Sequence, residues 1–302
     1  MFDYEYMGNS SYSADVNMAL EEYILRKPKK ASFRLWSFDK DAAILGYAQA
    51  TDAVKKRDAS FDVSRRISGG SHVQTGRNIL AYSVAVPRDG TFVSYEDMRA
   101  YYAQKVALAL ESLGIDDVSV DNRASTVSVG GKVIASHAMV WGVERALLHG
   151  LVIISPYDAI KMKDRMHLGS RKIGSNMYTE YSAIRSIPVV SLLLGKIAPA
   201  APEGDRNEVL KKIVGESLLA HFTEGNHENV AVDSRVMAES RSLIKKKFGN
   251  SLWTEAKKPP FTEDEIEEIP GEKLDGPLKK GLGYCMYSQV RDKDFKKCCE
   301  SF

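Results

Sequence analysis

Residues 64–78, SRRISGGSHVQTGRN, combine two adjacent arginines, a glycine pair and several hydroxyl side chains. The glycines permit positive φ angles and a close backbone approach to a ligand, so their N–H groups could bind an anion together with Ser68 and Ser71. A tight turn with solvated arginines explains these residues equally well. No lysine follows the glycines at the Walker spacing, which argues against a P-loop.

A second candidate is TVSVGGKVIAS, residues 126–136, in which alternating segments flank a glycine pair. A Gly-Gly turn predicts a β-hairpin that pairs Val129 with Lys132. Strict alternation would then place five residues on one face of the hairpin: Val127, Val129, Lys132, Ile134 and Ser136. A lysine on an apolar face is costly to desolvate unless an anion reaches it, so the pattern alone favours an exposed Lys132.

Three histidines, His72, His137 and His149, fall within or beside the candidate segments. Each belongs to a different expected element, and no cysteine accompanies them at the spacing of a metal site. We therefore expect no structural zinc. Isolated histidines are more often core or surface residues than metal ligands.

The elements that must position these residues follow from the hydrophobic pattern. Helices are expected at 13–26 and 94–113, where apolar residues recur every three or four positions. Strands are expected in segments rich in β-branched and apolar residues: 32–39, 41–49, 78–87, the hairpin 125–142, and 146–155. The first two strands should form a hairpin or a close pair, and the last should pair with the hairpin 125–142. Strands on both sides of a long helix indicate an α+β fold.

The character of the sequence changes near residue 200, where APAAPEGD is typical of a linker or exposed loop. Two more helices are expected beyond it, at 207–222 and 234–248. We therefore divide the chain into residues 1–198, which carry the candidate motifs, and residues 199–302, a helical C-terminal extension or small accessory region.

Composition narrows the class of protein. The 302 residues include 44% hydrophobic and 27% charged residues, which is ordinary for a globular protein, and the net charge of +2 gives no basic field for nucleic acid. The only cysteines, Cys285, Cys298 and Cys299, do not resemble a disulfide framework, so a reducing cytoplasm is expected. No export signal and no membrane span is evident.

In order along the chain, these segments resemble the lipoate-protein ligase A family of the biotin/lipoate protein ligase fold. The resemblance covers roughly residues 5–195 and is carried by NMALEEYIL, ILGYAQ, RRISGG, GRNILAYS, GGKVIASHA, LLHG and LGSRKIGSN. It implies a catalytic domain of mixed β-sheets packed with helices. It also implies a two-step reaction, in which lipoate or octanoate and ATP form an acyl-adenylate and a protein lysine then takes the acyl group.

The resemblance also implies roles for individual residues. Lys132 would be catalytic, because a fixed ammonium on a strand neutralises charge where two anions are joined. This reverses the exposed position that the pattern favours, and loss of Lys132 should impair adenylation far more than binding. The residues implied to contact lipoate or acyl-AMP are Arg66, Ser68, Gly69, Gly70, Ser71, His72, Asn78, Ser136, His137, His149 and Gly150. Those implied to contact the nucleotide are Arg65, Gly76, Asp121, Asn122 and Lys172.

The implied cofactors are ATP and Mg²⁺, with lipoate as substrate and with no metal ligand assigned. The implied partner is a lipoyl-domain acceptor, either the E2 component of a 2-oxoacid dehydrogenase or the glycine-cleavage H protein. A separate accessory subunit is also compatible with the resemblance. The family's accessory C-terminal domain is not recognisable in residues 199–302, although SLIKKKFGNSLWTEAKKP resembles its tryptophan-containing segment.

The sequence departs from the family pattern in two places. After the glycine pair it reads Ser71-His72-Val73-Gln74, and the usual Asn-Asp pair before the hairpin appears only as Asp121-Asn122. Both changes affect the expected nucleotide and metal contacts and the choice of acyl group.

Three alternatives remain. An octanoyltransferase that uses a cysteine nucleophile lacks one in residues 1–284. A biotin-protein ligase fits RRISGGS less well than a lipoate ligase. A non-catalytic lipoyl-binding protein would not need the retained Lys132.

Overall fold

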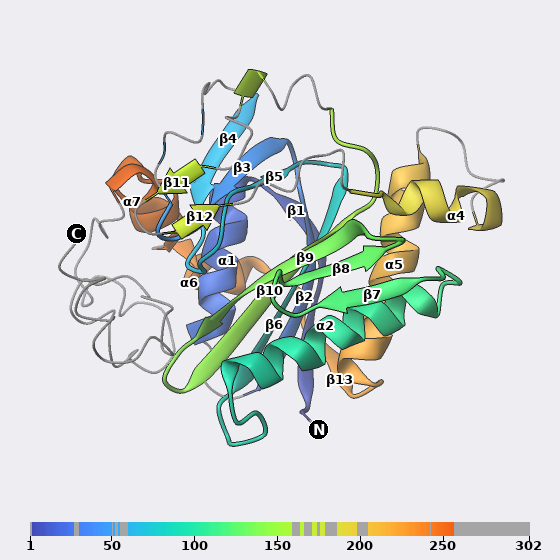
Figure 1. Cartoon of the computed structure of the whole chain (residues 1–302). Helices are drawn as coiled ribbons and strands as arrows, with labels where there is room; N and C mark the ends of the chain where they lie inside the picture. The colour runs from blue at the N-terminus through green and yellow to red at the C-terminus, as the bar shows by residue number, and fades with distance from the viewer. Residues whose placement is uncertain are drawn as a thin grey trace.

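The computed structural model describes residues 2–26, 30–49, 51, 54, 60–158, 164–165, 171–173, 176–178, 186–197, 205–241 and 243–256. Its centre is an eight-stranded sheet with the order β13-β1-β2-β6-β10-β9-β8-β7 (Figure 1). These strands are β1 (Tyr4–Tyr12), β2 (Ala31–Phe38), β6 (Ile79–Pro87), β7 (Val118–Asp121), β8 (Thr126–Val129), β9 (Lys132–Trp141), β10 (Arg145–Ile153) and β13 (His227–Asn229). Strand β1 runs parallel to β2 and β13, whereas the other neighbours pair antiparallel. The expected α+β fold with mixed sheets is confirmed.

Two smaller sheets accompany the large one. Three strands form a sheet with the order β4-β3-β5: β3 (Asp41–Leu45), β4 (Phe61–Arg65) and β5 (Val73–Thr75). A separate pair consists of β11 (Arg171–Ile173) and β12 (Asn176–Tyr178). The segment RRISGGSHVQT, residues 65–75, therefore begins at the end of one strand of the three-stranded sheet and ends with another.

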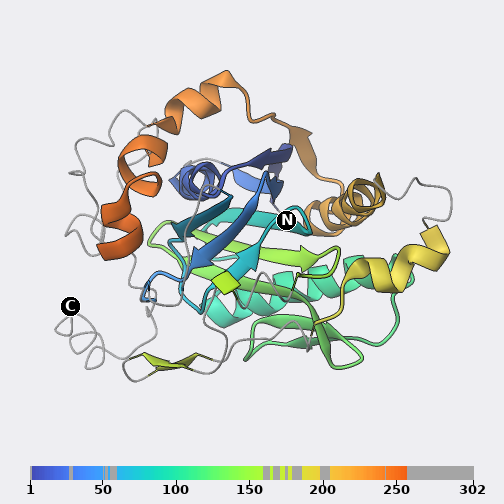
Figure 2. The same ribbon diagram turned by 90° about the horizontal axis from the view of Figure 1, so that it is seen from above.

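Helices cover both faces of the large sheet, as Figure 2 shows. They are α1 (Ala14–Arg26), α2 (Tyr95–Glu111), α4 (Val189–Ile197), α5 (Arg206–Thr223), α6 (Ser234–Glu239), a π-helix η4 (Leu243–Phe248) and α7 (Ser251–Ala256). On one face, α2 and α5 bury Tyr102 and Phe222 against Tyr82 of β6. On the other face, α1 and η4 pack with Trp36 and the three-stranded sheet. No helix in the described ranges is both long and apolar enough to span a membrane.

The strongest sequence patterns give the expected helices. Helix α2 begins after Ser94, whose side chain accepts a hydrogen bond from the backbone N–H of Asp97, and it ends shortly before Gly114, which has φ +78°. Helix α1 fills most of the expected range 13–26, and α5 matches the expected helix at 207–222. The expected helix at 234–248 is instead divided into α6 and η4.

One strand pairing was wrongly predicted. Strands β2 and β3 were expected to pair with each other, but β2 lies between β1 and β6 in the large sheet, whereas β3 pairs with β4 and β5. Strand β2 is hydrogen-bonded on both edges, to β1 and to β6, so it cannot also pair with β3. Strand β1 was not expected at all.

The Gly-Gly hairpin is confirmed, with φ +55° at Gly130 and +74° at Gly131 and with Val129 opposite Lys132. The predicted common face is wrong, because the register shifts next to the turn: Val127 pairs with Ala135, and Thr126 pairs with Ser136. A β-bulge of this kind adds one residue to β9 and reverses the side-chain alternation beyond it. Lys132 and Ser136 therefore lie on opposite faces.

The described part of residues 199–302 packs onto residues 1–198. Helix α5 contributes Leu210, Val214, Leu218 and Phe222 to the core on the α2 face. Helices α6, η4 and α7 contribute to the core on the α1 face. Cys285, Cys298 and Cys299 lie outside the described residues.

Candidate active site

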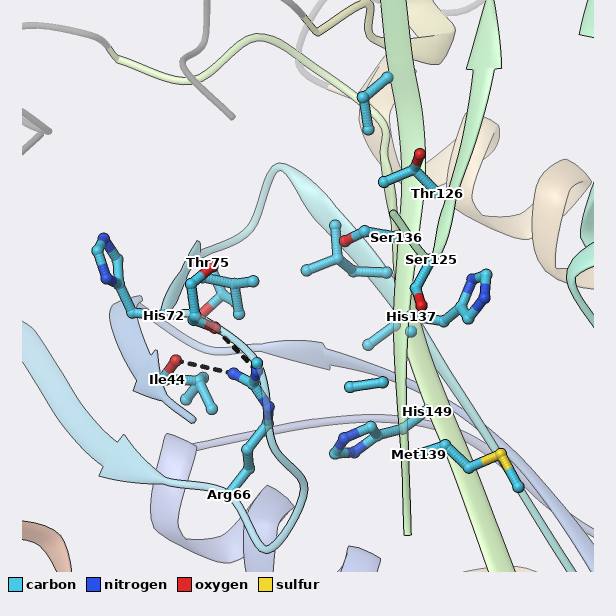
Figure 3. Close-up of a pocket in the computed structure, with 18 of the residues that line it drawn as sticks. Ile44, Arg66, His72, Thr75, Ser125, Thr126, Ser136, His137, Met139 and His149 are labelled. Atoms are coloured by element: carbon cyan, nitrogen blue, oxygen red, sulfur yellow. Dashed lines mark hydrogen bonds between the residues drawn. The ribbon is translucent and has the colours of Figure 1, made fainter. Parts of the chain in front are cut away.

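A cavity of about 550 Å³ is lined by residues of the large sheet, the three-stranded sheet, α1, α2 and the loop between β4 and β5 (Figure 3). One part of its lining is apolar and contains Met18, Trp36, Phe38, Ile44 and Ala81. Three arginines also line it, Arg66, Arg99 and Arg123, and the described lining contains no aspartate or glutamate. A cavity with these properties suits a ligand that joins an apolar chain to an anionic group.

The loop after β4 is shaped by Arg66, which is 6% exposed. Its guanidinium donates to the Gly69 carbonyl (2.5 Å from Nη2), the Ser71 carbonyl (2.8 Å) and the Ile44 carbonyl (3.2 Å). Gly70 has φ +91°, a conformation that favours glycine. The expected residues Gly69, Gly70, Ser71 and His72 all line the cavity, and Arg66 holds the Gly69 and Ser71 carbonyls of this loop.

Arg65 does not line the described cavity. Its side chain is fully buried and donates to the carbonyls of Gly46 (2.9 Å), Gln49 (2.6 Å) and Thr254 (2.7 Å). Successive side chains of a strand point to opposite sides, so the neighbouring arginines differ in role. Arg65 connects the loop after β3 to α7, and the structure does not bring it to the expected nucleotide site.

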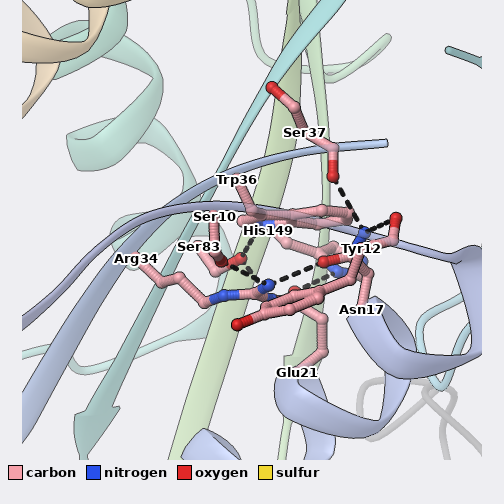
Figure 4. A network of polar contacts seen from close by, with 9 residues as sticks. All are labelled: Ser10, Tyr12, Asn17, Glu21, Arg34, Trp36, Ser37, Ser83 and His149. Atoms are coloured by element: carbon pink, nitrogen blue, oxygen red, sulfur yellow. Dashed lines mark hydrogen bonds and ion pairs between the residues drawn. The ribbon is translucent and has the colours of Figure 1, made fainter. Parts of the chain in front are cut away.

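A buried polar chain orients His149 (Figure 4). Its Nδ1 lies 2.8 Å from Glu21 Oε2, and its Nε2 lies 2.5 Å from Ser68 Oγ. A carboxylate only accepts hydrogen bonds, so Nδ1 donates to Glu21, and Nε2 and the Ser68 hydroxyl form a second hydrogen bond. Ser68 in turn accepts from Arg66 Nε at 2.9 Å. Ser68 thus lies behind the lining and connects the loop to His149, which lines the cavity.

Glu21 is held by further buried groups of the same network. It accepts a hydrogen bond from Ser83, which accepts one from Trp36 Nε1 at 2.7 Å, and it forms an ion pair with Arg34 at 3.7 Å. Burial lowers the pKa of Arg34 to about 10 despite the nearby carboxylate of Glu21. Sequence reasoning missed Glu21, although a glutamate pair on an otherwise apolar helix segment, ALEEYIL, was an available signal.

Gly150 on β10 and Gly76 and Asn78 before β6 were also expected at the site. Gly150 lines the cavity, and a Cβ there would lie 2.3 Å from Tyr82 Oη. A Cβ at Gly76 would lie 2.6 Å from Asp41 Oδ1. Asn78 lies outside the described lining and accepts the backbone N–H of Ile154 at 2.9 Å. Gly76 and Asn78 therefore support the neighbouring strands.

Lys132 lies at the exposed start of β9, outside the described cavity lining. The next residue, Val133, does line the cavity, as does Ser136. Lys132 and Val133 are consecutive on the strand and point to opposite faces, and the bulge after Val133 places Ser136 on the same face as Val133. The exposed position that the hairpin pattern favoured is the observed one.

Asp121 and Asn122 do not line the described cavity. The Asp121 carboxylate accepts the backbone N–H groups of Arg123 (2.8 Å) and Ala124 (3.0 Å), and these bonds lower its pKa. Asn122 is exposed in the same turn. Lys172 belongs to β11, whose side chains are outside the description. Sequence reasoning missed Arg99 and Arg123, because arginines on a helix surface and in a turn resemble ordinary solvated residues.

Two cavity histidines titrate far from their usual range. Burial, followed by the charge of Arg66, lowers the pKa of His72 to about 4, and its Nδ1 accepts a hydrogen bond from Gln49 Nε2 at 2.7 Å. Burial, followed by the charges of Arg99 and His149, lowers the pKa of His137 to about 4. Both rings are therefore neutral near pH 7.

We expect the free energy of unfolding to fall as the pH decreases from about 6.5 to about 4. In this window the unfolded chain binds protons at His72 and His137 that the folded chain does not bind. Urea unfolding at pH 7 and pH 5 measures the difference, and His137→Leu should make it smaller. The same substitution at His221 on α5 is the control, and an equal decrease in both variants would contradict the assignment.

The sequence profile of the lipoyl protein ligase A/B catalytic domain matches residues 13–178. Because this match covers more than half of the chain, the protein belongs to that family. The family and the fold expected from the sequence are thereby confirmed.

Solved structures share the fold. A bipartite lipoate protein ligase from Thermoplasma acidophilum, described with its E2 lipoyl domain, has 18% identity and a TM-score of 0.64 over 83% of this chain and 96% of its own. A lipoate-protein ligase A bound with ATP has 17% identity and a TM-score of 0.64 over 83% and 98%. LipL1 of P. falciparum, in complex with lipoate, has 14% identity and a TM-score of 0.62 over 85% and 76%. No curated protein gives a significant match.

Proposed function

We propose that the protein is an ATP-dependent lipoate-protein ligase, which activates lipoate or octanoate as acyl-AMP and transfers the acyl group to a lysine of a lipoyl domain or a glycine-cleavage H-type protein. The observation that carries the proposal is the cavity, whose described lining combines an apolar part with three arginines and no acidic residue. The acyl chain would occupy the part near Trp36 and Ile44. The arginines would compensate the negative charge of the carboxylate and the phosphates.

The first step forms a bond between a carboxylate oxygen of the acid and the α-phosphorus of ATP, and pyrophosphate leaves. In the second step the acceptor lysine attacks the acyl carbonyl, AMP leaves, and the amine loses a proton as the amide forms. Two anions must approach each other in the first step, so positive groups fixed around the reacting atoms lower its barrier. Arg66 and the orienting chain from Ser68 to His149 hold one wall of the site in a single arrangement.

Two competing reactions fit less well. A transferase that carries the acyl group on a cysteine has no nucleophile in residues 1–284. A biotin-protein ligase would perform the same adenylation on a bicyclic acid, and the preference for lipoate rests on the loop RRISGG. Pyrophosphate release with biotin or with lipoate as the only acid separates these two ligases.

The described residues do not form a binding site for Mg²⁺. Their cavity lining offers no carboxylate, and no cluster of three or more His, Cys, Asp or Glu side chains occurs in the described ranges. We therefore assign no step to a protein-bound metal, and Mg²⁺ enters the assays only with ATP.

Lys132 is proposed to assist adenylation from the rim of the cavity. Lys132 is exposed and directly precedes Val133, which lines the cavity, so a ligand that extends over the start of β9 comes within reach of the ammonium. We expect Lys132→Ala to slow acyl-adenylate formation by about one to two orders of magnitude, with a smaller effect on ATP binding. Pyrophosphate release measures the step, and Lys212→Ala on the surface of α5 is the control. Normal adenylation by Lys132→Ala would remove this residue from the mechanism.

The function is tested with the full chain, lipoate, ATP, Mg²⁺ and a purified lipoyl domain, followed by intact mass of the acceptor. A lipoyl increment that needs ATP and the acceptor lysine is the expected result, and a lysine-to-arginine acceptor is the control. Acyl-adenylate formation without transfer would indicate an accessory subunit, an arrangement consistent with the bipartite ligase of T. acidophilum. If the protein binds lipoate or octanoate but transfers neither acid in the presence of ATP, the result would favour a non-catalytic protein.

A further inference from the structure

Two side chains that line the cavity carry buried nitrogen atoms without a hydrogen-bond partner among the described residues. His137 is 7% exposed, and neither of its ring nitrogens has a hydrogen-bond partner among the described residues. The Nε of Arg99 is also buried and has no hydrogen-bond partner among the described residues. Both residues line the cavity. Because an unpaired buried donor destabilises the folded state, groups of this kind usually meet a ligand or water.

The two side chains lie beside the free edge of β9. Strand β8 begins at Thr126, opposite Ser136, so it does not cover the rest of this edge. The backbone N–H of His137 donates to the Ser125 carbonyl at 3.0 Å, and Arg99 Nη1 donates to Ser125 Oγ at 3.4 Å. The cavity thus continues past this edge to α2, and His137 and Ser125 lie across the β9 ribbon from Arg66 (Figure 3).

The charge around this edge is positive. Arg99 and Arg123 both line the cavity, and no ion pair joins either of them to a carboxylate within the described part of the chain. The nearby Asp121 is exposed, and its carboxylate accepts two backbone N–H groups of its own turn. A neutral imidazole and a guanidinium both present N–H donors. The complementary ligand is an oxygen anion, and arginine matches the geometry of phosphate especially well.

We propose that Arg99, His137 and Ser125 form a phosphate subsite on the α2 side of strand β9, and that this subsite binds phosphate oxygens of the nucleotide. The identity of the ligand rests on the proposed function. The apolar lining near Trp36 and Ile44 lies on the α1 side of the sheet, so the acyl chain occupies the other end of the cavity. The subsite therefore takes the phosphates and not the acyl carboxylate.

Isothermal calorimetry with three probes tests the subsite: inorganic pyrophosphate, ATP with Mg²⁺, and lipoate. The variants are Arg99→Gln and His137→Leu, and Arg235→Gln on α6 is the matched control because its side chain is 74% exposed and pairs with Glu239. Both cavity variants should weaken pyrophosphate and ATP binding by at least about tenfold, with lipoate changed by less than about twofold. The control should bind all three probes as the wild type does.

Three results would overturn the subsite. In the first, the wild type binds neither pyrophosphate nor ATP. In the second, both variants bind these two probes as the wild type does. In the third, the variants lose only lipoate binding, which would place the acyl carboxylate beside Arg99. The thermal unfolding of the unliganded His137→Leu variant gives an independent readout. Because it removes an unpaired buried group, its Tm should stay constant or rise at pH 7, whereas a lower Tm would show that His137 is a structural residue.

The two proposals fail separately. Weaker pyrophosphate binding in the variants together with absence of lipoyl transfer would retain the phosphate subsite and reject the ligase. Lipoyl transfer by the wild type together with unchanged phosphate binding in the variants would retain the ligase and reject the subsite.

Discussion

Glu22→Ala should lower the free energy of unfolding by about 3–5 kcal/mol, because it removes the buried carboxylate that pairs with two buried cations. Glu22 is fully buried in α1, and its carboxylate lies 2.5 Å from Lys247 Nζ and 2.6 Å from Arg26 Nη2. Burial alone would raise the pKa of Glu22, but Lys247 and Arg26 together outweigh burial and lower it. Urea unfolding at pH 7 measures the loss.

The control is Glu216→Ala on the surface of α5, where the pair with Lys212 spans 4.0 Å and both side chains are largely exposed. That variant should differ from the wild type by less than about 0.5 kcal/mol. The double variant Glu22→Leu/Lys247→Met removes two of the three charges, so it should be more stable than Glu22→Ala. A loss below about 1 kcal/mol in Glu22→Ala would contradict the buried network.

This ion cluster matters for the site because it joins α1 to the C-terminal helices. Lys247 lies 4.1 Å from the centroid of the Trp253 ring, and Trp253 Nε1 donates to the Arg65 carbonyl at 2.9 Å. Arg65 in turn donates to the carbonyls of Thr254 and Gln49. The Gln49 side chain donates to His72 at the cavity. Residues 243–256 therefore support the loop from behind, although they lie far from it in the sequence.

The sequence predicted the local elements well and the long-range pairings poorly. Helix α2 and the hairpin of β8 and β9 follow from an apolar period, a serine cap and a Gly-Gly turn, all of which act over a few residues. The three-stranded sheet joins β3 to β4 in parallel across a connection without a comparable local signal. Residues 41–49 consequently looked like the partner of the preceding strand.

The site shows the same division. The loop containing Arg66 and the strand containing His149 were found because their motifs are contiguous. Arg65 and Lys132 were expected at the site, but the structure places both outside the described cavity lining. Their positions depend on the direction in which a side chain points, and one bulge or one step along a strand reverses that direction. Arg99 comes to the cavity only because β8 leaves the edge of β9 uncovered, which is a property of the sheet and not of any motif.

Gly46, at the end of β3, controls the position of the loop and was found only as part of the motif ILGYAQ. A Cβ added to Gly46 would lie 1.8 Å from the Gly70 carbonyl oxygen and 2.8 Å from its carbonyl carbon. Both are backbone atoms, so no side-chain rotation relieves the contact. The loop is also tied to this point by the hydrogen bond from the Tyr47 N–H to the Ser68 carbonyl, at 2.9 Å.

Gly46→Ala should therefore displace the loop at Gly70 by about 1 Å or more and reduce acyl-adenylate formation by more than about 10²-fold, because a displacement of this size is enough to misplace reacting groups. Pyrophosphate release and calorimetry with lipoate and ATP measure the effect. Gly69→Ala is the control for folding, since its Cβ would meet no atom within 4 Å, and it should unfold at the wild-type temperature. If Gly46→Ala bound lipoate and ATP as the wild type does, the loop would not form a wall of the substrate site, and the role assigned to Arg66 would be wrong as well.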